Sequence, residues 1–388
     1  MRLLNFKLGL DYENRIFGLD LLRAFAILFV VYSHGCNFLA PYIDIHWYEF
    51  WFLDGVSIFF VLSGFLIGTI FIQGIEQAPL NAAFVFNFWK RRWFRTLPNY
   101  FLVLTFLVVY FDLLHHYSYK NSISYFFFLQ NMVTEHPAFF REAWSLAVEE
   151  WFYLLLPLGY IAFFYINKGA KRKSIFYVII SFICVPLLLR LLVYFYLNNC
   201  DKHLYDSIFR KLVFLRFDSI MIGVLGAYLN IYKIELWEKI HRQFKAGIVL
   251  MLGIHLIGVL GNFDNRGLCF FMSIFYSFLF SIGVLLIIPK LQNYQPKKIR
   301  PWHRFFMFIS VISYSMYLLN LTLFKSILGP LYNSLFTGVI ENQFLLAILK
   351  YTYFWILVIF LSYLLFIFWE RPWMELRKKI APKLKTPN

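Results

Sequence analysis

Long apolar runs alternate with short polar segments along almost the whole chain. A helix needs about 20 mostly apolar residues to cross the hydrocarbon core of a membrane. A window of that length predicts ten such helices, with approximate limits at 19–39, 49–72, 96–112, 143–166, 174–197, 212–230, 246–261, 268–289, 305–328 and 344–369. The pattern therefore predicts an all-α polytopic membrane protein, a single bundle of about ten transmembrane helices.

The composition supports this prediction. Of the 388 residues, 61% are hydrophobic, 22% are aromatic and 15% are charged, whereas soluble domains average about 45–50% apolar and 25% charged residues. The length suits one helical bundle. We therefore expect a single domain over residues 1–388, with a core at 10–372 and a basic cytoplasmic tail at 373–388.

The basic residues orient the predicted bundle. If the N-terminus is cytoplasmic, 26 of the 37 lysines and arginines fall in inner segments and 6 fall in outer loops. Cytoplasmic loops of membrane proteins carry such an excess. We therefore predict an even number of spans with both termini in the cytoplasm. Topology and contact with membrane lipid then account for the net charge of +16, so we predict no nucleic-acid partner.

The first predicted span, GLDLLRAFAILFVVYSHG (Gly18–Gly35), contains three polar side chains, Asp20, Arg23 and His34. A charge at the centre of a membrane helix costs about 2.5–3.5 kcal/mol on insertion scales, so such groups normally face protein or a watery cavity. Arg23 and His34 are separated by about three helical turns, or ~16 Å, and point to a similar side. One helix thus carries a cation near the predicted inner face and an imidazole near the outer face.

The fourth predicted span begins AWSLAVEEWFYLLLP and runs inward from the outer face. Glu149 and Glu150 lie about two turns below that surface, at a depth similar to that of His34. Carboxylates and an imidazole in one buried layer are typical of acid–base chemistry. Ser145 is four residues before Glu149 and shares its helix face, so we include Ser145 among the candidate substrate-binding residues.

A basic cluster, FWKRRWFRTLP, precedes the third predicted span and contains Arg92 and Arg95. Both lie at the predicted level of Arg23, which gives a basic inner layer. Basic residues that flank a span commonly serve topology and contact lipid headgroups, and Arg23 can also reach the headgroups by snorkelling. These alternatives stay open for all three arginines.

The four cysteines, Cys36, Cys184, Cys200 and Cys269, show neither a CxxC motif nor a Cys/His metal spacing. Three of them fall in or beside apolar runs, and Cys200 lies in a loop. We interpret them as small core residues with one loop cysteine, and we predict no metal site.

Seven sequence blocks, in this order, resemble the membrane acyltransferase-3 family of bacterial O-acyltransferases that modify cell-surface glycans. They are GLDLLRAFAILFVVYSHG (18–35), GVSIFFVLSGFLIG (55–68), FWKRRWFRTLPNY (88–100), AWSLAVEEWFYLLLP (143–157), RFDSIMIGVLGA (216–227), ISYSMYLLN (312–320) and WERP (369–372). Taken alone, the glycines and serines of the second block indicate tight helix packing. Two features depart from the family pattern. Asn320 stands where histidine is expected, so we place no catalytic role there, and no hydrolase-like SGNH domain follows Pro372.

The resemblance implies a ten-helix acyltransferase of the bacterial inner membrane that uses cytoplasmic acyl-CoA, usually acetyl-CoA, as donor substrate, with no permanently bound cofactor. It implies that His34 is catalytic and that Arg23, Arg92 and Arg95 serve the donor. Arginine forks suit the phosphates of CoA, and the long pantetheine arm could cross the ~16 Å to His34. The expected acceptor is a cell-envelope glycan or a lipid-linked saccharide.

We expect His34 to act as a general base or, as a second choice, as an acyl carrier. Glu149, or as a second choice Glu150, would fix its tautomer. Arg216 and Asp218 are expected either to position the acceptor or to form a structural ion pair. Acceptor specificity is expected in the outer loops, of which Leu113–Arg141 is the longest.

Two other functions fit parts of the pattern. A proton-coupled transporter would also use buried His and Glu residues, but the spans show no two-half symmetry. An unrelated membrane-bound O-acyltransferase would not explain the order of the blocks. The soluble-type HxxxxD motif is absent, because Leu39 occupies the fifth position after His34.

Overall fold

The computed structural model describes residues 15–44, 49–115, 119–198, 200–336, 338 and 340–380, excluding the side chains of 113–115 and 119–121. Over this part of the chain the structure is 81% helix and contains no strand. The all-α prediction is therefore confirmed. Of the expected specificity loop, residues 116–118 lie outside the described residues, as do residues 381–388 of the expected tail.

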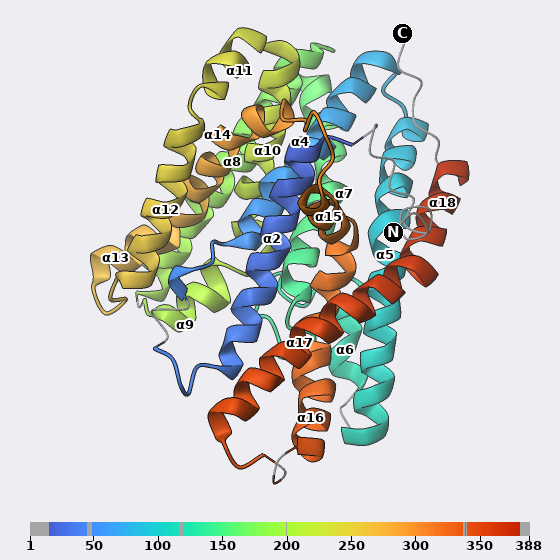
Figure 1. Ribbon diagram of the computed structural model, residues 1–388. Coiled ribbons are helices and arrows are strands. Elements are labelled where there is room, and N and C mark those ends of the chain that lie inside the picture. Colours follow the sequence, from blue (N-terminus) through green and yellow to red (C-terminus); the bar gives the residue numbers. More distant parts are fainter. Residues whose placement is uncertain are drawn as a thin grey trace. The chain divides into compact units, whose positions relative to one another are not determined.

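The helices follow one another along the chain as Figure 1 shows. The α-helices are α2 (Phe17–Gly35), α4 (Gly55–Gln77), α5 (Ala82–His115), α6 (Tyr119–Phe126), α7 (Ala143–Ile166), α8 (Lys171–Leu197), α9 (Lys202–Leu204), α10 (Phe217–Tyr232), α11 (Ile234–His241), α12 (Phe244–Leu260), α13 (Arg266–Phe271), α14 (Ser277–Gln292), α15 (Pro301–Leu319), α16 (Gly329–Phe336), α17 (Gln343–Leu365) and α18 (Arg371–Ile380). Short 3-10 or π segments are η1 (Cys36–Phe38), η2 (Tyr205–Phe209), η3 (Val213–Leu215), η4 (Met272–Tyr276), η5 (Phe324–Leu328) and η6 (Phe366–Glu370).

Every predicted span has a helical counterpart among the described residues. Seven helices are long and apolar enough to cross a membrane, and two bent pairs raise the number of candidates to nine. The bent pairs are α10 with α11, at 118°, and α15 with the helix at Phe324–Phe336, at 59°. The remaining counterpart, α12, is a shorter apolar helix. The chain is thus a multi-pass membrane protein with at least seven apolar helices of spanning length.

The third predicted span differs most from its helix. We predicted it at 96–112, but α5 begins at Ala82 and includes the whole basic cluster. Lysine and arginine are good helix formers, so the backbone stays helical where the hydropathy signal is lost. Arg92 and Arg95 are therefore fixed on a continuous helix.

The described helices form two compact units, each built from separated stretches of sequence. Among the described residues, the first unit contains those of 15–55, 94–115 and 291–379, and the second contains those of 56–93 and 119–290, with residue 380. The boundary between them runs through α5. The boundaries at 10–372 and 373–388 stay predictions.

In the first unit, α2 packs along α15, and both helices contact α17. The side chains of Ala24, Ile27 and Val31 on α2 are fully buried. Gly35, next to His34, allows a close approach to α17, because a Cβ there would lie 2.7 Å from a ring carbon of Phe354. This packing holds the C-terminal end of α2 in a fixed place within the unit.

In the second unit, α4 and α10 approach closely enough that only glycine fits at two positions. A Cβ on Gly64 would lie 1.9 Å from the carbonyl oxygen of Ile220, and one on Gly223 would lie 2.0 Å from that of Val61. Small residues permit such backbone contact between membrane helices. The tight packing predicted for the second sequence block is therefore confirmed.

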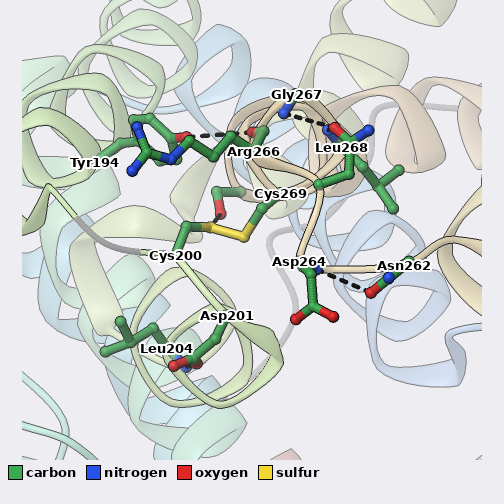
Figure 2. Close-up of a disulfide and its surroundings, with 12 residues drawn as sticks. Tyr194, Cys200, Asp201, Leu204, Asn262, Asp264, Arg266, Gly267, Leu268 and Cys269 are labelled. Atoms are coloured by element: carbon green, nitrogen blue, oxygen red, sulfur yellow. Dashed lines mark hydrogen bonds between the residues drawn. A yellow bond between two sulfur atoms is a disulfide. The ribbon is translucent and has the colours of Figure 1, made fainter.

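A disulfide joins Cys200, just after α8, to Cys269 in α13 (Figure 2). The Cα atoms are 6.1 Å apart, within the usual range for a disulfide. Nearby, the Tyr194 hydroxyl donates to the Arg266 carbonyl at 3.3 Å. Our interpretation of the cysteines as small core residues with one loop cysteine missed this bond, because a pairing across 69 residues is set by tertiary structure and leaves no spacing motif.

Candidate active site

The N-terminal end of α2 carries an ion network centred on Asp20, which is buried with 3% of its surface exposed. Arg15 donates to both carboxylate oxygens, at 2.6 and 2.5 Å. Arg23 donates to Oδ1 at 3.1 Å, and the Ser310 hydroxyl of α15 donates to the same atom at 2.7 Å. The carboxylate therefore fixes two guanidinium groups in place.

Arg23 retains hydrogen-bonding capacity within this network. Its contacts to Asp20 and to the Ser310 hydroxyl, at 3.4 Å, both use Nη1. A guanidinium has five N–H donors, and 16% of this side chain is exposed. The charges of Arg23 and Arg95 also repel each other. The first unit thus brings together two of the three arginines that we predicted for an anionic donor.

Arg95 is also attracted to a buried carboxylate that the sequence analysis did not single out. This is Glu370 in the WERP block, which is 5% exposed and feels the charge of Arg95. Its Oε2 accepts from Asn99 Nδ2 at 2.9 Å and from the Ser315 hydroxyl at 2.7 Å. The sequence did contain a signal for this residue, since Glu370 is an acidic residue at the end of the last apolar segment and such a group needs partners in the membrane.

At the C-terminal end of α2, Nδ1 of His34 forms a short hydrogen bond with Oδ1 of Asn320. Asn320 follows the last residue of α15 and is 1% exposed. Its Nδ2 donates to the carbonyl oxygens of Met316 at 2.9 Å and Tyr317 at 2.8 Å. We placed no role at Asn320 from the sequence, yet the structure makes it a direct partner of His34.

In the second unit, Glu149 belongs to a network that joins α7, α4 and α5. The Tyr153 hydroxyl donates to Glu149 Oε2 at 3.0 Å and lies 2.6 Å from the Ser63 hydroxyl. The Arg92 guanidinium lies 5.6 Å from the centre of the Tyr153 ring, a cation–π distance. The structure thus links Arg92 to Glu149 through Tyr153, a residue missing from our candidate set.

Two other candidates on α7 are buried. Glu150 is 8% exposed and Ser145 is 4% exposed. The Ser145 hydroxyl donates to the backbone carbonyl of Glu142 at 3.5 Å. His34 belongs to the first unit and Glu149 and Glu150 to the second, so the pairing of His34 with a glutamate stays a prediction.

Arg216 and Asp218 have separate partners inside the second unit. Asp218 forms an ion pair with Arg190 of α8 at 2.5 Å, while Arg216 donates to the hydroxyls of Ser57, at 2.8 Å, and Ser277. All three charged side chains are fully buried. Leaving one member of a buried pair alone typically costs about 3–5 kcal/mol. The structure thus gives Asp218 a partner that we had not considered, Arg190, and both an Arg216–Asp218 pair and a role toward the acceptor stay predictions.

A polar cluster outside the spans surrounds the start of α7. The Arg210 guanidinium lies 5.4 Å from the centre of the Trp144 ring and donates to Asp206 at 2.5 Å. Burial raises the pKa of Asp206, but the charges of Arg210 and Lys211 outweigh it and lower the pKa to about 2. Burial, together with the charge of Lys211, lowers the pKa of His136 to about 3. His136 is therefore neutral and Asp206 is charged at neutral pH.

Among the described residues, no group of three His, Cys, Asp or Glu side chains is arranged to hold a metal ion. What the first unit does provide is a fixed imidazole at one end of α2 and fixed guanidinium groups at the other. An imidazole can move a proton, and guanidinium groups can bind phosphate.

Comparison with known proteins identifies similar sequences. The acyltransferase domain family matches residues 16–369. The putative peptidoglycan O-acetyltransferase YrhL of Bacillus subtilis is 33% identical over 179 residues, which is 42% of this chain and 26% of that protein. The O-acetyltransferase OatA of Staphylococcus aureus is 31% identical over 172 residues, 41% of this chain and 26% of that protein. Both matches span about a quarter of the relative's length, and no solved structure matches significantly.

Proposed function

Because the chain belongs to the acyltransferase domain family, we propose that it is an integral-membrane O-acyltransferase. It moves an acyl group, acetyl being the expected case, from cytoplasmic acyl-CoA to a hydroxyl group of a cell-envelope glycan or a lipid-linked sugar. The names of the similar proteins support O-acetyl transfer and a glycan acceptor.

The observation that carries this proposal is the two-ended arrangement of α2. Within one compact unit, Arg23 is held by Asp20 near the start of the helix, and His34 is held by Asn320 at its end. The rise of the helix separates the two side chains by ~16 Å along its axis. This separation suits a long donor whose charged end and reactive end are far apart.

The donor's phosphates would bind at the arginine end. Arg23 and Arg95 lie within electrostatic range of each other, and a dianionic phosphate relieves the repulsion between two guanidinium groups by bridging them. Arg92, on the same helix as Arg95, keeps its predicted role toward the donor. The pantetheine arm then carries the thioester to His34.

At the other end, the acceptor hydroxyl would lose its proton to Nε2 of His34 as its oxygen attacks the thioester carbonyl carbon. The tetrahedral intermediate collapses, the C–S bond breaks and the ester forms. The departing CoA thiolate takes the proton back from Nε2, which restores neutral His34. Glu149 would stabilise the transient imidazolium, and the Tyr153 hydroxyl that donates to it would hold the carboxylate in place.

The reaction also requires a defined topology, which we propose as ten spans with both termini in the cytoplasm of a bacterial inner membrane. The excess of lysine and arginine in alternate loops supports it. The disulfide supports it as well, because Cys200 and Cys269 then face the oxidising side, where disulfides persist. Cysteines introduced at Tyr42 and Asn342 should react with impermeant reagents from outside only, and labelling of both from the cytoplasmic side would contradict the topology.

Mass spectrometry of surface glycans from cells with and without this protein tests the function. We expect the protein to add the mass of one acetyl group to a fraction of the saccharide units. A gain of the succinyl mass instead would mean that the donor carries a succinyl group, and the reaction class would stay the same. Identical glycans, together with proton-coupled uptake in vesicles that contain the protein, would replace the proposal with a transporter.

A further inference from the structure

We infer that Asn320 is a positioning residue that holds His34 in the tautomer protonated at Nδ1, so that Nε2 is the nitrogen that accepts the proton. The inference about the reacting atom rests on the proposed role of His34 as general base. The hydrogen-bond pattern around the Asn320 amide carries it.

The amide of Asn320 has only one favourable orientation. Its Nδ2 donates both hydrogens, to the carbonyl oxygens of Met316 and Tyr317 at 2.9 and 2.8 Å. In the flipped amide, Oδ1 would face these two carbonyl oxygens, and neither of them has a proton to donate. The side chain is also 1% exposed, so water cannot replace the lost bonds. Oδ1 therefore faces His34.

That orientation decides which ring nitrogen of His34 carries the proton. A carbonyl oxygen of an amide only accepts hydrogen bonds, and neutral imidazole has a single N–H group. Since Oδ1 of Asn320 bonds Nδ1, Nδ1 must be the donor. The lone pair needed by a base is then on Nε2, as in other histidines whose tautomer is set by the partner of the second nitrogen.

The partner is also neutral, and this makes the inference testable. An amide orients the ring without stabilising the imidazolium, whereas a carboxylate at the same place would do both. Asn320→Asp should keep the tautomer, but the oxygen that replaces Nδ2 then faces the carbonyl oxygens of Met316 and Tyr317, so it must hold a proton and the partner of His34 stays neutral. Asn320→Leu keeps the branched shape of the side chain but has no acceptor, so it should release the tautomer and leave the ring less well oriented.

Other titratable side chains on this end of α2 and on the elements near it include Tyr32, Cys36, Tyr317, Lys325, Lys350, Tyr351 and Tyr353. Tyrosines, thiols and lysines ordinarily titrate above pH 8. Glu149 and Glu150 belong to the other unit. The pH–rate profile of Glu149→Gln, measured in parallel, shows whether the Glu149 carboxylate contributes to the acidic limb. The acidic limb of the pH–rate profile between pH 5 and 8 then reports His34.

The first test is kinetic and uses purified full-length protein. For Asn320→Leu we expect kcat to fall by roughly tenfold or more, with KM for acetyl-CoA within about twofold of wild type, because orientation of the base acts on the chemical step. For Asn320→Asp we expect an unshifted acidic limb and a kcat between those of wild type and Asn320→Leu, because the protonated carboxyl still accepts from Nδ1 but donates to only one of the two carbonyl oxygens. The control is Asn37→Leu, since Asn37 is exposed and its side chain donates to the backbone oxygens of Ser33 and His34.

The second test reads the tautomer directly, by NMR of protein labelled with ¹⁵N-histidine, with His34→Gln used for assignment. We expect a protonated Nδ1 in wild type and a mixture of tautomers in Asn320→Leu. A protonated Nε2 in wild type, or unchanged kcat and pH profile in a folded Asn320→Leu protein, would overturn the inference. Nδ1 protonation without any acyl transfer would instead leave the pairing intact and overturn the proposed function.

Discussion

The two ends of α2 hold their polar side chains by different means. At the start of the helix, a buried carboxylate binds two guanidinium groups and a hydroxyl. At its end, an imidazole bonds a neutral amide that is itself fixed by two backbone carbonyls. Fixed charge suits the binding of an ion, while a neutral partner suits a group whose charge must change during a reaction.

Under the proposed function, this difference would separate donor binding from chemistry along one helix. A charged partner at the His34 end would favour the imidazolium at rest and remove the base. A neutral partner at the Arg23 end would leave two repelling guanidinium groups without compensation. Variants at the two ends should therefore fail in different ways, and this expectation can be tested.

The largest effect is expected for His34→Ala. Loss of a general base typically lowers the rate by about 10²–10⁴-fold, so we expect acyl transfer to fall by that amount. Binding of acetyl-CoA should survive, because the arginine end is unchanged. The truncation leaves no buried charge, so the protein should still insert and fold. The measurement is acyl transfer and acetyl-CoA binding by purified, monodisperse protein, and near-normal transfer would end the catalytic assignment.

Arg95→Ala and Arg92→Ala should give the opposite pattern. A hydrogen bond to a charged group contributes about 1.5–3 kcal/mol, so we expect KM for acetyl-CoA to rise roughly tenfold or more while kcat stays within a few-fold. Lysine should rescue only in part, because it lacks the planar fork. Lys90→Ala is the matched control, an exposed basic residue on the same helix. If the arginine variants bound acetyl-CoA with the affinity of wild type, α5 would have no role in the donor site.

Asp20→Asn should give a smaller effect of the same kind. The amide keeps the shape of the carboxylate but can no longer balance Arg15 and Arg23, so the guanidinium groups lose their orientation. We expect KM for acetyl-CoA to rise a few-fold, about 1 kcal/mol in binding free energy, with kcat little changed. Glu375→Gln, which removes an exposed ion pair on α18, should have no measurable effect. A fall in kcat with normal KM would mean that Asp20 serves the reaction and not the donor.

The sequence predicted what depends on local pattern. Hydropathy placed the apolar helices, because membrane insertion selects about 20 apolar residues regardless of their partners. The spacing of Arg23 and His34 on one helix was also predictable, since it follows from helical rise alone.

The sequence did not predict the partners that complete each site. Asn320 bonds His34 across 286 residues, and Glu370 bonds Asn99 across 271. The disulfide closes 69 residues. Such pairs depend on which helices pack together, and a single sequence contains no record of that. Polar residues in apolar blocks were nevertheless a usable signal, because a buried polar group needs a partner.

Acid can reduce activity in two ways, by protonating His34 and by lowering the free energy of unfolding. A control variant is therefore needed for the second effect. Burial, aided by the charge of Lys211, lowers the pKa of His136 to about 3 in the folded protein, against about 6.5 for an unperturbed histidine. The unfolded chain therefore binds an extra proton below pH 6.5. As the pH falls from about 6.5 toward 3, the free energy of unfolding should decrease.

The variant His136→Gln removes this titration, and its effect is expected to be the smallest of the set. Its melting temperature should decline less between pH 6.5 and 4 than that of wild type, as measured by thermal unfolding in detergent. The carbonyl of Pro137 and the ring of Tyr125 flank the side chain, and glutamine can still donate to that carbonyl. The acidic limb of kcat should not move, because His136 lies outside α2 and its partners. If the limb shifted with His136→Gln, pH-dependent loss of transfer could no longer be assigned to the imidazole at the end of α2.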